Sequence, residues 1–160
     1  MSLAEFTVGL PHTPSNMPLE ARVATLVDSG AFVLVDVADA ARFAAEPGDS
    51  VILLTADTRN NPESWDALIV LPEVLRGYAG RLRAAIALPA ASAQLALRFG
   101  ARTYPSLLFQ RAGDFVGIID GLQDWDVYVR RTAEMLAAPV GRAPSIGVAV
   151  VSGGDSGTCH

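Results

Sequence analysis

The run of four apolar residues at 51–54 limits the possible folds of this chain more than any other feature. A strand that is apolar along its whole length is buried on both faces, as in parallel sheets covered by helices. Two further strands are predicted at 32–35 and 81–88, and helical spacing of apolar residues is found at 18–30, 39–46, 64–79 and 90–99. This alternation of strands and helices predicts parallel strands joined by right-handed crossovers.

The second half of the chain changes pattern. Residues 106–110 and 115–119 read as two strands of a hairpin whose turn, 111–114, contains Gly113. A last helix is predicted at 124–137, with Asp124 as its cap and an inward face of Trp125, Tyr128, Val129 and Leu136. The sum is an α/β fold: a mixed sheet, partly parallel and partly an antiparallel hairpin, with helices on both faces and an extra helix in front.

One helix of this series contains an anomaly. The helix at 64–79 presents a predicted apolar face of Trp65, Leu68, Ile69, Leu71, Leu75 and Tyr78, but Pro72 interrupts it. A proline inside a helix costs about 3 kcal/mol and kinks it, so Pro72 requires a structural reason.

The 160 residues suit a single folded domain. The first 17 residues mix Pro, Thr, Ser and Asn without a period and are expected to form a loose arm. The domain is expected at 18–138, followed by a flexible tail at 139–160 that is rich in Gly, Ala, Pro and Ser.

Composition excludes several classes of function. The net charge is −5 and the basic residues do not cluster, so no nucleic-acid partner is expected. Cys159 is the single cysteine, and the two histidines are His12 and His160. These residues allow no internal disulfide, no CxxC redox pair and no thiolate zinc site, so no metal or cofactor is expected.

No run of about 18 apolar residues occurs, so no membrane span is expected. The N-terminus lacks the basic and apolar regions of a signal peptide, which makes the cytoplasm the expected compartment.

The stretch 96–109 resembles the segment of thioredoxins that enters their cis-proline strand. On this resemblance Pro105 is the cis-proline, Gly113 and Gly121 match the hairpin glycine and the glycine before the last helix, and Pro72 matches the proline that kinks the active-site helix. The resemblance implies a thioredoxin-like fold. Counting back from Pro72, however, the CxxC positions hold Ser64, Trp65, Asp66 and Ala67, which cannot exchange disulfides.

From residue 18 to 138 the chain resembles more narrowly the hydrogenase expression/formation family called HupG or HyaE. The marks are the front helix, the run 51–54 followed by Asp57, Pro62-Glu63 and Asp66 in place of CxxC, Leu75, Phe99-Gly100, Tyr104-Pro105, and Gly121 with Trp125. The resemblance implies a cytoplasmic, non-enzymatic assembly chaperone for an uptake [NiFe]-hydrogenase. Its partners would be the small-subunit precursor, with the twin-arginine signal peptide as one candidate segment, and other maturation proteins.

The acidic side chains around the altered motif, Asp57, Glu63, Asp66 and Glu73, are a candidate patch for the two arginines of such a signal peptide, because guanidinium pairs bidentately with carboxylate. They are equally consistent with a solvated loop and a helix N-terminus. Trp65 is either an exposed contact at the mouth of a groove or a core residue. Tyr104 and Pro105 are either a peptide platform or fold determinants only.

Two rival functions stay open: a protein-interaction adaptor that binds through its helices or tail, and a single-cysteine thiol-dependent reductase or peroxidase using Cys159. The sequence leaves the oligomeric state and the bound partner segment undecided.

Overall fold

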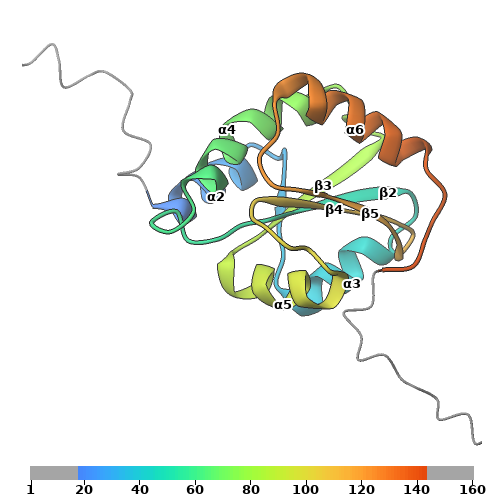
Figure 1. The fold of residues 1–160 in the computed structure, drawn as a ribbon, viewed down its shortest axis with the longest axis horizontal. Helices are drawn as coiled ribbons and strands as arrows, with labels where there is room; N and C mark the ends of the chain where they lie inside the picture. Colours follow the sequence, from blue (N-terminus) through green and yellow to red (C-terminus); the bar gives the residue numbers. More distant parts are fainter. Residues whose placement is uncertain (1–17, 144–160) are drawn as a thin grey trace, which may run out of the picture.

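A five-stranded mixed sheet forms the centre of the protein. The structure, a computed structural model, describes residues 18–143. The sheet has the order β1-β3-β2-β4-β5, with β1, β3 and β2 parallel and with β4 and β5 antiparallel to their neighbours (Figure 1). The strands are β1 (Val33–Leu34), β2 (Asp49–Leu54), β3 (Leu82–Ala87), β4 (Ser106–Arg111) and β5 (Asp114–Asp120).

Helices cover both faces of the sheet, as the sequence predicts. α2, α4 and α6 lie on one face, and α3 and α5 lie on the other (Figure 1). The helices are α2 (Leu19–Asp28), α3 (Val37–Ala45), α4 (Pro62–Arg76), α5 (Pro89–Phe99) and α6 (Trp125–Ala137). No helix in the described part of the chain is long and apolar enough to span a bilayer.

The predicted burial of residues 51–54 is confirmed, because β2 lies at the centre of the sheet. Val51 and Leu53 pack among the residues of α2, α4 and α6, while Ile52 and Leu54 pack toward α3 and α5. All four side chains are buried. The alternation of side chains along a strand thus divides one apolar run between two cores.

The buried strand predicted at 32–35 is found only as the short strand Val33–Leu34, and its expected burial is wrong for these two residues. Only Phe32 and Val35 are buried; Val33 is 52% exposed and Leu34 is 44% exposed. The reason is topological, because β1 is the edge strand of the sheet and pairs with β3 at only two positions.

Two helix faces also differ from the prediction. α4 buries positions spaced by three and four, namely Ser64, Ala67, Leu68, Leu71, Val74 and Leu75, and this leaves Ile69 exposed. In α6, Tyr128 and Thr132 are buried while Trp125 and Val129 are exposed. Apolar identity alone does not determine which side of a helix meets the core. α4 also ends at Arg76, so Tyr78 follows it.

The predicted arm at 1–17 and most of the predicted tail lie outside the described residues.

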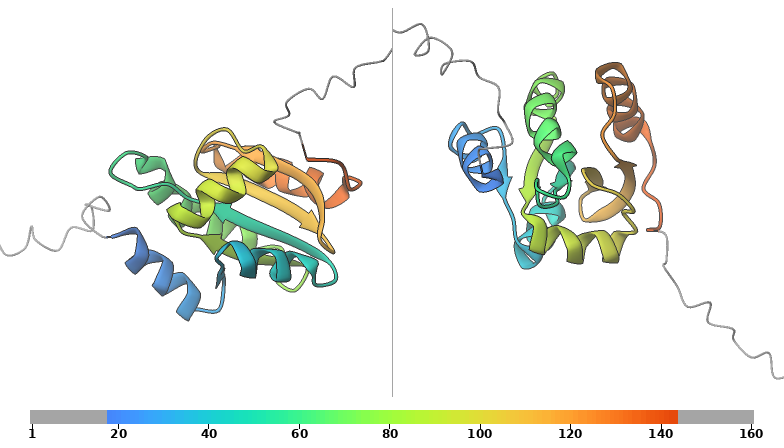
Figure 2. Two further views of the ribbon diagram at one scale, coloured as in Figure 1. Left: turned by 90° about the horizontal axis from the view of Figure 1, so that it is seen from below. Right: turned by 60° about the vertical axis from the view of Figure 1, so that its left-hand side comes forward.

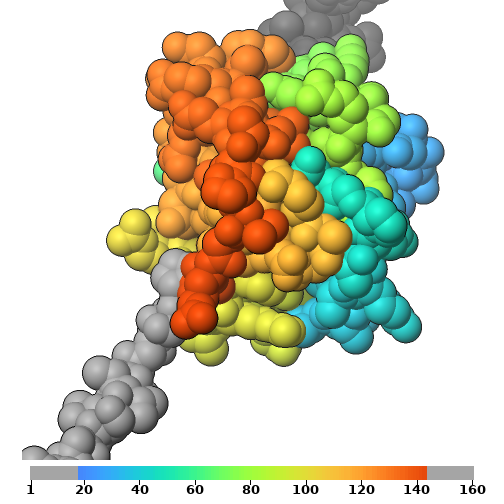
Figure 3. Space-filling view, turned by 90° about the vertical axis from the view of Figure 1, so that its right-hand side faces the viewer, coloured from blue at the N-terminus to red at the C-terminus, as the bar shows by residue number. Residues whose placement is uncertain are grey.

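The chain after α6 crosses the β4–β5 hairpin (Figure 3), where the Gly141 N–H donates to the Phe115 carbonyl at 2.7 Å. Arg111 fixes the end of α6: its Nη1 donates to the Ala138 carbonyl at 2.7 Å and its Nε lies 2.6 Å from Asp49.

The front helix α2 explains how Pro72 is accommodated. A proline at 72 has no N–H, so the Leu68 carbonyl one turn earlier loses its helical donor. Arg22 of α2 supplies the missing donor, because its Nη2 lies 3.2 Å from the Leu68 oxygen. A single side chain therefore satisfies the interrupted turn of α4 and joins α2 to it.

We expect Arg22→Met to lower the free energy of unfolding by about 1–3 kcal/mol, because a half-buried carbonyl is left without a donor. In a Pro72→Ala background, residue 72 regains its N–H, so the same substitution should cost clearly less. Urea unfolding of the four proteins of this double-mutant cycle measures the coupling. An equal cost of Arg22→Met in both backgrounds contradicts the assignment.

Candidate functional site

The altered motif lies beside the cis-proline loop because of the sheet register. Leu54 at the end of β2 pairs with Ser106 at the start of β4, so the segments that follow β2 and precede β4 meet at one end of the sheet. One segment leads into α4, and the other holds the Tyr104–Pro105 peptide bond, which is cis as predicted. The first turns of α4 and the cis-proline loop together make up the candidate site.

A buried hydroxyl connects the parts of this site. Ser64 Oγ accepts from the Ala56 N–H at 3.0 Å and donates to Asn61 Oδ1 at 2.7 Å. Asn61 Oδ1 also accepts from the Ser64 N–H at 2.9 Å, which caps α4, while its Nδ2 donates to the Tyr104 carbonyl at 2.9 Å. Ser64 is thus fully buried and engaged as both donor and acceptor, at the position that the resemblance to thioredoxins gives to the first cysteine of CxxC.

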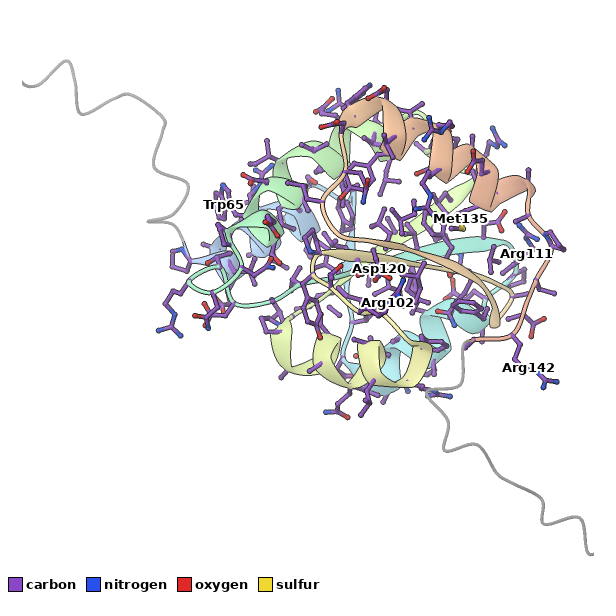
Figure 4. The ribbon with its side chains drawn as sticks, viewed as in Figure 1. Trp65, Arg102, Arg111, Asp120, Met135 and Arg142 are labelled. Carbon is purple, nitrogen blue, oxygen red and sulfur yellow. The ribbon has the colours of Figure 1, made fainter. Side chains whose placement is uncertain are left out.

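The other positions of the altered motif differ in accessibility. Ala67 is buried, and Trp65 is only 7% exposed, with no hydrogen-bond partner for its indole Nε1 among the described residues. Figure 4 shows Trp65 on α4, at the end of the molecule where α2 begins. Asp66 is exposed. Among the four positions of the altered motif, only Asp66 has a solvent-exposed polar side chain that a partner could contact.

The cis-proline loop is held by the strand beside it. The Gly121 N–H donates to the Pro105 carbonyl at 2.8 Å, and the Arg102 N–H donates to Asp120 Oδ1 at 3.0 Å (Figure 4). Pro105 is buried. Tyr104 is half-buried, and this burial raises the pKa of its phenol above the ordinary value. The loop is therefore a fixed surface beside the start of α4.

The predicted acidic residues do not form one uniform patch. Glu63 and Asp66 are exposed at the start of α4, and neither forms an ion pair within the described residues. Asp57 is engaged by Arg59, whose Nη2 lies 2.7 Å from Asp57 Oδ2. Glu73 pairs with Arg76 near the other end of α4. Free carboxylates are thus found at two of the four positions.

Sequence reasoning overlooked Asn61 and Arg59. The signal for Asn61 was available, since an asparagine directly before a proline at the first helical position is a common helix start. The link from Asn61 to Tyr104 had no such signal, because it spans 43 positions. No group of three or more His, Cys, Asp or Glu side chains suited to a metal ion is found within residues 18–143.

The chain is similar in sequence to known hydrogenase expression proteins. A family model described as hydrogenase-1 expression protein HyaE matches residues 23–128. The hydrogenase expression/formation protein HoxO of Cupriavidus necator is 36% identical over 159 residues, which cover 98% of this chain and 97% of the relative. HupG of Bradyrhizobium diazoefficiens is 38% identical over 109 residues, covering 68% of this chain and 74% of the relative.

A solved chain from a study of thiol resolution in yeast mitochondrial 1-Cys peroxiredoxin, which involves the glutathione and thioredoxin systems, superposes with a TM-score of 0.54. The identity is 13%, and the match covers 66% of this chain and 94% of that one. At this identity the likeness concerns the fold alone, and the predicted thioredoxin-like fold is confirmed.

We expect Asn61→Ala to lower the free energy of unfolding by about 1–2 kcal/mol, because α4 loses its cap and Tyr104 its donor. Asn61→Asp keeps the acceptor for the Ser64 N–H but removes the donor to Tyr104. Urea unfolding of both variants separates the two contributions. If Asn61→Asp is as stable as the unmodified protein, the link to the cis-proline loop contributes nothing.

A second prediction concerns pH. The hydrogen bonds from Arg59 lower the pKa of Asp57 from 3.8 to about 2. Since the pKa in the folded state is the lower one, the stability that this interaction contributes is fully present above pH 3.8. It is lost as the pH falls through about 2. We expect an NMR titration of the Asp57 carboxyl to show this low midpoint and Arg59→Gln to raise it. A midpoint near 3.8 in the unmodified protein contradicts the pairing.

Proposed function

Because the chain belongs to the HyaE family of hydrogenase expression proteins, we propose that it assists the maturation of a [NiFe]-hydrogenase by binding a partner, without catalysing a reaction. The observation that carries this proposal is the buried, doubly hydrogen-bonded Ser64 at the position where a thioredoxin has a reactive thiol. A hydroxyl held in this way has neither the exposure nor the free base that a nucleophile needs.

The proposed ligand is the small-subunit precursor of the hydrogenase, bound through its twin-arginine signal peptide. Exposed Glu63 and Asp66 are suited to guanidinium groups, because no cation within residues 18–143 forms an ion pair with them. Asp57 is less suited, since Arg59 already occupies its carboxylate. The arginine contacts are therefore assigned to the first turn and a half of α4.

Charge alone does not supply the affinity of such a complex. An exposed ion pair contributes about 0–1 kcal/mol, so apolar and backbone contacts must contribute the larger share. The proposed platform for these contacts is the half-buried Tyr104, held in place by the buried Pro105 beside it, with the peptide in an extended conformation. Asn61 Nδ2 donates to one lone pair of the Tyr104 carbonyl, and in the proposed complex a peptide N–H donates to the other.

The direct test is a calorimetric titration of the full-length protein with a synthetic twin-arginine signal peptide of a hydrogenase small subunit. A version with two lysines in place of the arginines is titrated beside it, at low and at high salt. We expect micromolar binding that weakens with the lysine peptide and with salt, because bidentate pairing is lost in one case and charge is screened in the other. Absence of binding by both peptides overturns the signal-peptide assignment.

The double variant Glu63→Gln/Asp66→Asn should weaken binding of the arginine peptide by about three- to tenfold, since two exposed ion pairs are lost. It should also flatten the salt dependence. Asp126→Asn/Glu134→Gln on α6 is the matched control, because it removes the same two charges from exposed positions on another helix. Equal affinities for the two double variants would reject the patch.

A further inference from the structure

The edge of the sheet at β3 is only partly covered. β3 pairs with β2 along all six of its residues, from Leu82 to Ala87, but with β1 only at Ala85 and Ile86. Residues 82–84 consequently have no strand on their outer side within the described part of the chain. Figure 2 shows this edge, with α2 and β1, at the end of the molecule away from β5 and α6.

The strand register tells which backbone groups face this gap. The Val35 N–H donates to the Ile86 carbonyl at 3.0 Å, so the backbone groups of Ile86 point toward β1. Backbone direction alternates along a strand, so the N–H of Ala84 and the carbonyl of Leu82 point the same way. There they meet a gap instead of a strand, and an unpaired edge of this kind is a template for another extended chain.

A groove of about 970 Å³ lies along this gap. Its wall on one side comes from α2 and the end of α4, where Leu26, Pro72 and Leu75 are apolar. The exposed side chains of Val33 and Leu34 continue the apolar surface along the edge itself. An extended segment with apolar side chains would therefore find both backbone partners and side-chain contacts there.

The charges of the groove select the kind of segment. Three of its arginines have carboxylate partners of their own: Arg42 with Asp39, Arg76 with Glu73, and Arg83 with Glu46. Arg22 also lines the groove, but it forms no ion pair within the described residues, and one of its donors alone is used, toward Leu68. A carboxylate on a bound segment would pair with Arg22, as Asp39, Glu73 and Glu46 pair with the other three arginines.

We propose that this groove is a second binding site, which takes an extended segment of a partner protein carrying apolar residues and a carboxylate, added as a strand beside residues 82–84 of β3. The segment pairs with Ala84 and Leu82 through its backbone, packs against Val33 and Leu34, and directs its carboxylate to Arg22. The site prefers acidic segments, in contrast to the basic segment proposed for the start of α4, and it is independent of that proposal.

The probe is an acetylated and amidated heptapeptide of alternating valine and threonine with one central aspartate, compared with the same peptide carrying lysine. Hydrogen exchange of the full-length protein is followed by NMR. We expect the Ala84 amide to exchange like an unprotected amide in the free protein and at least tenfold more slowly at saturating aspartate peptide. The lysine peptide should bind at least threefold more weakly, because Arg22 repels it.

Leu34→Glu should weaken binding of the aspartate peptide at least fivefold, because it removes an apolar contact and adds a repelling charge. Leu97→Glu is the control, since Leu97 is an exposed leucine on α5, on the other face of the sheet. Unchanged exchange of Ala84 with saturating peptide overturns the proposal. So does protection of Ala84 in the free protein, and a dependence of that protection on protein concentration would then identify the occupant as a second copy.

Discussion

The hydrogen bonds of one buried hydroxyl, that of Ser64, hold the candidate site together. Through Ala56 they reach the end of β2, and through Asn61 they reach the start of α4 and the cis-proline loop. A buried polar network is stable when each member is satisfied. Here two of the bonds close the first turn of α4, one reaches Ala56 and one reaches Tyr104. The Ser64 hydroxyl thus serves as a structural link at the first position of the altered motif.

The front helix shapes the opposite end of α4. Because Pro72 leaves the Leu68 carbonyl without a helical donor, a donor from another element is needed, and Arg22 provides it. This contact keeps α2 against α4, where it also forms a wall of the groove beside β3. Arg22 therefore satisfies the carbonyl that Pro72 leaves without a donor and holds α2 against α4. It also contributes a positive charge to the groove beside β3.

The order of the elements could be predicted from the sequence because it depends on patterns within short windows. The run at 51–54 and the turn glycines are such patterns, and the cis bond at Pro105 followed from resemblance. Burial at the edges was predicted less well. Val33 and Leu34 are apolar but lie on an edge strand, and the exposed apolar residues of α4 and α6 depend on how each helix is rotated against the sheet. Similarly, pairing of Asn61 with Tyr104 depends on the register of β2 against β4, which no local pattern encodes.

The proposed binding surface consists of the first turns of α4, where Glu63 and Asp66 are exposed, and the cis-proline loop beside them. Mapping the bound peptide on the protein tests this most directly. In NMR spectra of the full-length protein, a twin-arginine signal peptide should shift the amide signals of Glu63, Asp66 and Tyr104 and leave that of Ala84 in place. Shifts confined to α6, or to the β3 edge, would contradict the claim that the altered motif and the cis-proline loop form the site.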